Sequence, residues 1–125
     1  IDEDFLESVI KEMGGVDIIL DDGSHHMNHI PKTLNVLFPF LSENGIYMIE
    51  DLHTAYFPKY GGGYKSKKNF FHMIRGLIDD MHHWYHGKTI KFPKISKECA
   101  AIHIHDSIVV LEKNNVFAPV HSQIK

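Results

Sequence analysis

The sequence is poor in cysteine and has no long apolar run. Cys99 is the only cysteine among 125 residues, which excludes an internal disulfide and fits a reducing compartment, expected to be the cytoplasm. No apolar stretch approaches the roughly 20 residues of a membrane-spanning helix. The first residues form no basic-then-apolar secretory signal and include no initiator methionine. We therefore expect the numbered chain to be a piece of a longer protein.

Neither sign of charge dominates. The chain has 13 Lys and Arg against 16 Asp and Glu, a net charge of −3, so we expect neither nucleic acid nor a membrane as partner. The one excess is histidine, with 11 residues. The length suits one domain, and the hydrophobic share of 43% is ordinary for a globular protein.

Apolar spacing predicts an α/β chain with the order α-β-α-β-α-β-β. The predicted helices cover residues 5–13, 30–41 and 67–86, and the predicted strands cover 16–20, 46–50, 99–105 and 107–113. The first two strands and the helix between them fit a parallel βαβ unit, and the last two fit an antiparallel hairpin. Both parallel strands are almost continuously apolar, which is typical of burial on both faces. Residues from about Asn114 to Lys125 look like a tail of this single domain.

Glycine marks two predicted irregular segments. Gly45 ends the run Ser-Glu-Asn-Gly, a turn in which we expect this glycine to adopt a positive φ. Three consecutive glycines, residues 61–63, lie in a loop between tyrosines. Such a loop is either mobile or closely approached by another group.

Acidic residues follow both predicted parallel strands. Asp21 and Asp22 end the first strand, and Glu50 and Asp51 end the second. Because the carboxyl ends of parallel neighbours meet at one edge of a sheet, the four carboxylates would gather there and repel one another. A hard divalent cation such as Mg²⁺ would relieve that repulsion. His25 is close enough in sequence to act as general base for a hydroxyl held by the ion.

Two other interpretations of these residues stay open. Acids after strands are common in turns and helix caps, so each one taken alone is more often structural. His25 and His29 have a spacing that suits zinc, although no cysteine or third ligand joins them at a familiar spacing.

Three segments together resemble the sugar O-methyltransferases of the macrocin and mycinamicin type. They are "DIILDDGSHHMNH", "GIYMIEDLHTAYFPKYGGG" and "AIHIHDSIVVLEK". These are class I enzymes that depend on S-adenosylmethionine, and a cephalosporin-hydroxylase-like group is related. The resemblance implies an enzyme that methylates a hydroxyl of a sugar or glycosylated small molecule, with Mg²⁺, or Mn²⁺ in its place, as the metal. It also implies the C-terminal half of a Rossmann-like sheet.

The resemblance assigns roles residue by residue. The metal ligands fall on Asp22, Glu50 and Asp51, and the catalytic base falls on His25. Asp21 falls on the cofactor side of its strand, with a supporting role. The residues that border the acceptor fall on His53 and Tyr56.

One feature of that enzyme class is missing. Class I methyltransferases hold the cofactor with a glycine-rich turn after their first strand, and no G-x-G-x-G occurs in this chain. The N-terminal, cofactor-binding half is therefore expected to lie outside it. Two alternatives remain: a non-catalytic fragment or degenerate metal-binding module, folded by forming a homo-oligomer through its sheet edge, or a hydroxylase-like relative that uses the same pocket differently.

Overall fold

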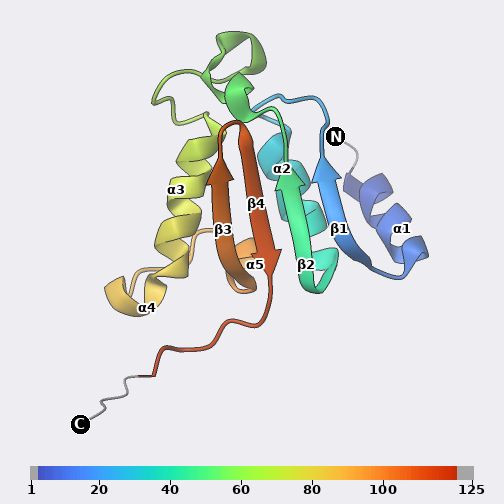
Figure 1. The fold of residues 1–125 in the computed structure, drawn as a ribbon, viewed down its shortest axis with the longest axis vertical. Helices are drawn as coiled ribbons and strands as arrows, with labels where there is room; N and C mark the ends of the chain where they lie inside the picture. The colour runs from blue at the N-terminus through green and yellow to red at the C-terminus, as the bar shows by residue number, and fades with distance from the viewer. Residues whose placement is uncertain (1–2, 121–125) are drawn as a thin grey trace.

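The computed structural model describes residues 3–120, and within them four strands form one mixed sheet. The strands are β1 (Val16–Asp21), β2 (Leu41–Ile49), β3 (Cys99–His105) and β4 (Ile108–Lys113). Their spatial order is β1-β2-β4-β3, with β1 parallel to β2 and the other two pairs antiparallel. The predicted α/β class, parallel pair and terminal hairpin are confirmed (Figure 1).

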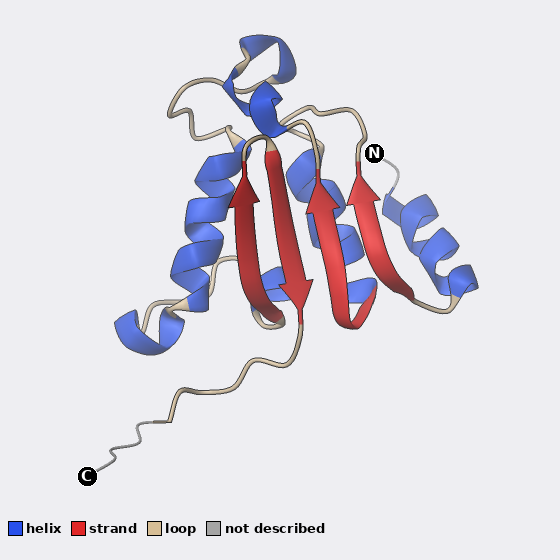
Figure 2. Cartoon of the chain, viewed as in Figure 1, coloured by secondary structure: helices blue, strands red, loops and turns tan. Residues whose placement is uncertain are grey.

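The helices are mostly short. They are α1 (Glu3–Met13), α2 (Ile30–Leu37), α3 (Phe70–Met81), α4 (His83–His86) and α5 (Pro93–Ser96), with 3₁₀ turns at Phe38–Phe40, Leu52–Tyr56 and Pro58–Tyr60. Figure 2 shows α2 and α5 behind the sheet, α3 beside β3 and α1 beside β1. Among the described residues, no helix has both the length and the apolar character that crossing a membrane requires.

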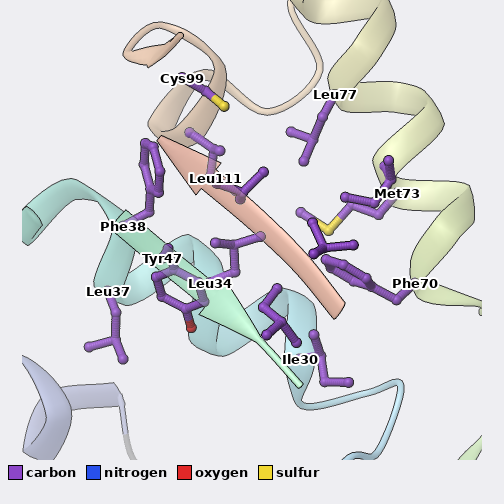
Figure 3. Packing of buried hydrophobic residues seen from close by; sticks show 14 of the residues in the cluster. Ile30, Leu34, Leu37, Phe38, Tyr47, Phe70, Met73, Leu77, Cys99 and Leu111 are labelled. Carbon is purple, nitrogen blue, oxygen red and sulfur yellow. The ribbon is translucent and has the colours of Figure 1, made fainter. Parts of the chain in front are cut away.

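The core lies between the sheet and the helices α2, α3 and α5. Tyr47 of β2 and Leu111 of β4 are fully buried there, against Leu34 of α2 and Leu77 of α3 (Figure 3). Burial of such side chains contributes roughly 1.5–3 kcal/mol each. The helices therefore pack on one face of the sheet and hold the strands in place.

The prediction that β1 is buried on both faces is wrong for this chain. Ile18 is 68% exposed and Leu20 is 55% exposed, while Ile19, on the other face, packs against the core. A continuous apolar run cannot distinguish one covered face from two, because both faces carry the same residue types. In the described part of the chain, the helices that build the core cover only the other face (Figure 1).

The long helix predicted for residues 67–86 is divided in the structure. Asn69, not Ser66, caps α3, and its side-chain oxygen accepts a hydrogen bond of 2.8 Å from the backbone N–H of Phe71. The helix ends at Met81, and the single turn α4 follows before Gly87. The apolar spacing continued across this break, which is why the sequence did not reveal it.

The two glycine expectations have different outcomes. The expected turn lies within the bounds of β2, and Asn44, not Gly45, has the positive φ there, at 67°. Gly45 is required instead by space, because a Cβ there would lie 2.7 Å from the carbonyl oxygen of Ser42. In the 61–63 loop, close approach is confirmed: a Cβ on Gly62 would lie 2.0 Å from the carbonyl oxygen of Ala55.

From Asn114 to Val120 the chain forms neither helix nor strand, which is compatible with a tail; residues 121–125 of that prediction lie outside the described part. The segment between β2 and α3 lies beyond the carboxyl end of β2, above the turn that joins β3 to β4 (Figure 1).

Candidate functional site

Two candidate metal ligands and the candidate base meet beyond the ends of β1 and β2. Nε2 of His25 lies 3.7 Å from Oδ1 of Asp22 and 3.6 Å from Oδ2 of Asp51. One ligand atom from each of these side chains lies within 4.8 Å of the other two. The parallel pairing of β1 with β2 brings Asp22 and Asp51 to the same sheet edge.

The donor set of this cluster suits a hard divalent cation. Six-coordinate Mg²⁺ holds its oxygen ligands at about 2.1 Å, so neighbouring ligand atoms lie about 3–4 Å apart. One oxygen of Asp22 and one of Asp51 lie within 4.8 Å of each other, close enough for both to reach one cation after a small shift. The Asp22 and Asp51 side chains are about half exposed, at 52% and 49%, so a cation could bind both and still retain water or a substrate oxygen.

Glu50 is not part of the cluster of Asp22, His25 and Asp51 that the described residues form. Its backbone N–H donates a hydrogen bond of 3.1 Å to the carbonyl of Asp21, which extends the strand pairing by one residue. The structure thus places Glu50 beside the site through its backbone. Its role as a metal ligand stays a prediction.

The two residues that face each other in the cluster have unusual backbones. His25 has φ of 60° and Asp51 has φ of 58°, both in the left-handed region. For a residue other than glycine, that conformation costs roughly 1 kcal/mol or more. Such residues persist where the surroundings hold them, and they are concentrated at functional sites.

Asp21 lies on the other side of the β1 end. Its carboxylate accepts hydrogen bonds from the Tyr47 hydroxyl and the Gly23 backbone N–H, each at 3.3 Å. Burial raises the pKa of the Asp21 carboxyl above its usual value, although both hydrogen bonds oppose the rise. Burial likewise raises the pKa of Tyr47, so the phenol stays protonated and donates to the carboxylate. Asp21 lines a cleft of about 290 Å³ together with Leu6 and Ile30.

The two predicted acceptor-side residues line one cleft. His53 and Tyr56 face a hollow of about 420 Å³ together with Phe71 and Ile104. The Tyr56 side chain is 48% exposed, and its ring lies 5.9 Å from the ring of Phe71. The structure therefore brings both residues to one cleft, and their contact with an acceptor stays a prediction.

The remaining histidines of the turn have structural contacts. Nδ1 of His29 lies 2.6 Å from the Ser24 hydroxyl, and the imidazole of His26 packs against Gly61, where an added Cβ would lie 2.8 Å from Cε1. His29 is not in the cluster that His25 forms with the two aspartates. The geometry does not support the zinc interpretation of His25 with His29.

Two residues that the sequence did not single out hold the site together. The Thr54 hydroxyl lies 3.0 Å from the carbonyl oxygens of His25 and of Asp51. Ser107, in the β3–β4 turn, accepts from the backbone N–H of His53 at its hydroxyl and from Leu52 at its carbonyl. A threonine three residues after a strand-ending acid is a weak local signal for such a turn. The contacts to distant segments have no signal in sequence spacing.

Curated sugar methyltransferases match most of this chain. An 8-demethyl-8-(2-methoxy-alpha-L-rhamnosyl)-tetracenomycin-C 3'-O-methyltransferase from Streptomyces olivaceus is 34% identical over 117 residues, covering 90% of this chain and 30% of that enzyme. Demethylmacrocin O-methyltransferase from Streptomyces fradiae is 30% identical over 115 residues, covering 86% of this chain and 29% of that enzyme. The chain thus spans less than a third of their length. No protein-family model matches the chain.

A solved structure shows the same fold. The MycE methyltransferase of the mycinamycin biosynthetic pathway, in complex with Mg, SAH and mycinamycin VI, superposes with a TM-score of 0.82 and 28% identity. The superposition covers 91% of this chain and 30% of MycE. It falls on the C-terminal region of that enzyme. By sequence and by fold, the chain is therefore a homologue of the C-terminal region of the macrocin- and mycinamicin-type sugar O-methyltransferases.

Proposed function

We propose that this chain supplies the metal-binding and proton-accepting part of an S-adenosylmethionine- and Mg²⁺-dependent O-methyltransferase. The acceptor would be a hydroxyl of a sugar or glycosylated small molecule, which is the kind of substrate that the relatives' names describe. The observation that supports this most directly is the cluster of Asp22, His25 and Asp51 at the ends of two parallel strands. Because the chain spans about 30% of those relatives, the complete reaction is a property proposed for the whole protein.

Asp22 and Asp51 would hold the divalent cation through their carboxylates, with Glu50 as a further candidate ligand. Oxygen ligands suit Mg²⁺, and Mn²⁺ fits the same set. A cation bound here would lower the pKa of a coordinated acceptor hydroxyl. The half-exposed carboxylates would fix where the cation lies and so where an acceptor hydroxyl binds.

His25 would accept the proton of the acceptor hydroxyl at Nε2. This nitrogen lies between the two carboxylates, at 3.7 and 3.6 Å, and so would lie beside an acceptor hydroxyl bound next to them. The imidazole is 26% exposed, so it reaches solvent and can release the proton afterwards. A histidine is suited to this exchange near neutral pH.

His53 and Tyr56 would border the acceptor in the cleft that they share with Phe71. An aromatic ring presents an apolar face to a sugar ring, while the phenol and the imidazole offer hydrogen bonds. The His53 ring is already oriented by the Ser107 hydroxyl, which lies 2.9 Å from Nδ1.

S-adenosylmethionine would be bound mainly by the rest of the polypeptide. Among the residues of this chain, Asp21 and the cleft beside α1 are the candidates for contact with it. They do not form the glycine-rich cradle that this class uses. We also propose that the protein works in the cytoplasm, since the one cysteine of this chain is buried and unpaired.

Binding of Mn²⁺ to the 125-residue chain tests the cluster. Electron paramagnetic resonance of free Mn²⁺ reports the affinity, and we expect D22N to weaken binding at least 10-fold because one of two charged ligands is lost. D17N is the matched control, since Asp17 is exposed at the other end of the same strand. Equal affinities for D22N and wild type would contradict the assignment.

A second titration tests whether S-adenosylmethionine is bound by this chain or by the rest of the protein. Calorimetry with S-adenosylmethionine should give no micromolar binding to the 125 residues alone. Micromolar binding would contradict the proposal that the cofactor is held elsewhere. The metal assignment would be unaffected by that result.

A further inference from the structure

Thr54 lies where the two halves of the candidate site meet. Its side chain is 3% exposed, and its hydroxyl lies 3.0 Å from the carbonyl oxygen of His25 and 3.0 Å from that of Asp51. A hydroxyl has one hydrogen to donate, and here that hydrogen is shared between two acceptors. The two acceptors belong to the histidine-rich turn after β1 and to the acidic turn after β2.

Both acceptors are the left-handed residues of the cluster. In His25 and in Asp51, the carbonyl and the side chain leave the same Cα, so a hydrogen bond that holds the carbonyl limits the directions in which the Cα–Cβ bond can point. Without the hydroxyl, the preference of L-residues for negative φ would favour relaxation of both residues. One hydroxyl therefore opposes relaxation of both residues at once.

We infer that Thr54 is a positioning residue, whose hydroxyl holds the His25 imidazole and the Asp51 carboxylate against each other. The inference rests on the proposed function only in naming a divalent cation as the ligand of that arrangement. Thr54 does not itself touch the cation or the acceptor; it acts through the backbones of the two residues that do.

The turns remain connected when the hydroxyl is removed. Thr54 also donates its backbone N–H to the Asp51 carbonyl at 3.3 Å, and the backbone N–H of Met27 donates to the Tyr60 carbonyl at 2.8 Å. These bonds involve the main chain and survive a side-chain substitution. The hydroxyl is therefore expected to matter more for the geometry of the cluster than for the folding of the chain.

Thr54→Val is the sharpest variant, because valine keeps the shape of threonine and loses the donor. Thr54→Ser is the matched control, because it keeps the donor and loses a methyl group. With Mn²⁺ alone as probe, we expect T54V to weaken binding at least 10-fold, a typical loss for a residue that orients metal ligands. We expect T54S to stay within about 3-fold of wild type, so that affinity follows the hydroxyl and not the packing.

A second measurement does not require a metal. The three-bond HN–Hα couplings and the backbone carbon shifts of His25 and Asp51, measured by nuclear magnetic resonance, report φ. In T54V both residues should move away from left-handed values, and in T54S they should keep them. Thermal unfolding of each variant shows whether the chain remains folded during these measurements.

The outcomes separate this inference from the proposed function. Wild-type chain that binds no Mn²⁺ would contradict the metal site, and the couplings would then decide the role of Thr54. Mn²⁺ affinity and couplings in T54V that equal those of wild type would overturn the inference and leave the metal site standing. Weakening in T54S as large as in T54V would overturn it too, because the effect would then come from packing.

Discussion

Three residues near the candidate site adopt a backbone conformation that side chains other than glycine rarely take. His25, Asp51 and Ser107 have φ of 60°, 58° and 65°. Each lies at the end of a strand or in a turn at the same edge of the sheet, and each has a hydrogen-bonded carbonyl. The strain of roughly 1 kcal/mol per residue is thus spread over one small region, where contacts between distant segments offset it.

Cys99 is a residue whose burial has a measurable consequence at high pH. Its thiol is 4% exposed, and burial raises its pKa from 9.0 to about 12. The unfolded chain loses this proton near pH 9 and the folded chain keeps it, so stability falls as pH rises between those two values. Between pH 8 and 10, the free energy of unfolding should fall by about 1.4 kcal/mol more in wild type than in C99A.

Denaturant unfolding of wild type and C99A at pH 8 and pH 10 measures this difference. Tyr47 and the lysines contribute equally to both proteins, so C99A isolates the thiol. Parallel loss of stability in the two proteins would show that Cys99 is accessible to solvent.

Some residues of the candidate site could be predicted from the sequence, and others could not. Asp22 and Asp51 were predictable because acids after parallel strands meet at one edge, and the structure brings both to His25. Thr54 was not predictable, because its bond to the His25 carbonyl links residues 29 positions apart. The side-chain position of Glu50 was equally out of reach, since adjacent residues at a strand end point in different directions.

At the scale of elements, α3 and α5 are joined by one buried carboxylate. Asp80 is 4% exposed and accepts hydrogen bonds from the backbone N–H groups of Lys91 and Phe92 and from the hydroxyl of Ser96, at 2.7–2.8 Å. Phe92, in turn, packs against Gly76, where an added Cβ would lie 2.8 Å from its ring. The carboxylate thus orients the segment that leads into α5 against the helix that covers the core.

Exchanging Asp80 for asparagine should therefore destabilise the chain. An amide replaces one acceptor oxygen with a donor that faces donors, so we expect a loss of about 2–4 kcal/mol in the free energy of unfolding. D79N, at the preceding residue, is the matched control. The Asp79 side chain is 55% exposed and forms an ion pair with Arg75 at 3.2 Å. An exposed pair of this kind contributes at most about 0.5 kcal/mol.

Urea unfolding of the two variants under identical conditions provides the comparison. Similar losses in D79N and D80N would contradict the anchoring role of Asp80. The sequence showed only two adjacent aspartates in a predicted helix, with nothing to distinguish them. Their different surroundings follow from the helix period, which turns one to the core and the other to solvent.

At the scale of the whole molecule, the order of elements and the sheet topology followed from apolar spacing and turn residues. The apolar spacing did not show which face of the sheet the helices cover. β1 and β2 carry apolar residues on both sides, and the described helices that build the core cover one side. A chain that spans about 30% of its relatives can thus form the core that supports its strand ends while one sheet face retains apolar residues in contact with solvent.

This asymmetry predicts responses of different size to the same substitution on the two faces. Ile18→Thr on the exposed face should change the free energy of unfolding by no more than about 0.5 kcal/mol, because the side chain is 68% exposed already. Ile49→Thr on the packed face should cost about 2–4 kcal/mol, because that side chain is 1% exposed and its replacement brings a hydroxyl into the core. Both substitutions keep a β-branched residue in a strand, so strand propensity is nearly constant between them. Thermal and denaturant unfolding of the two variants test the difference, and a loss in I18T as large as in I49T would mean that the exposed face is covered in solution.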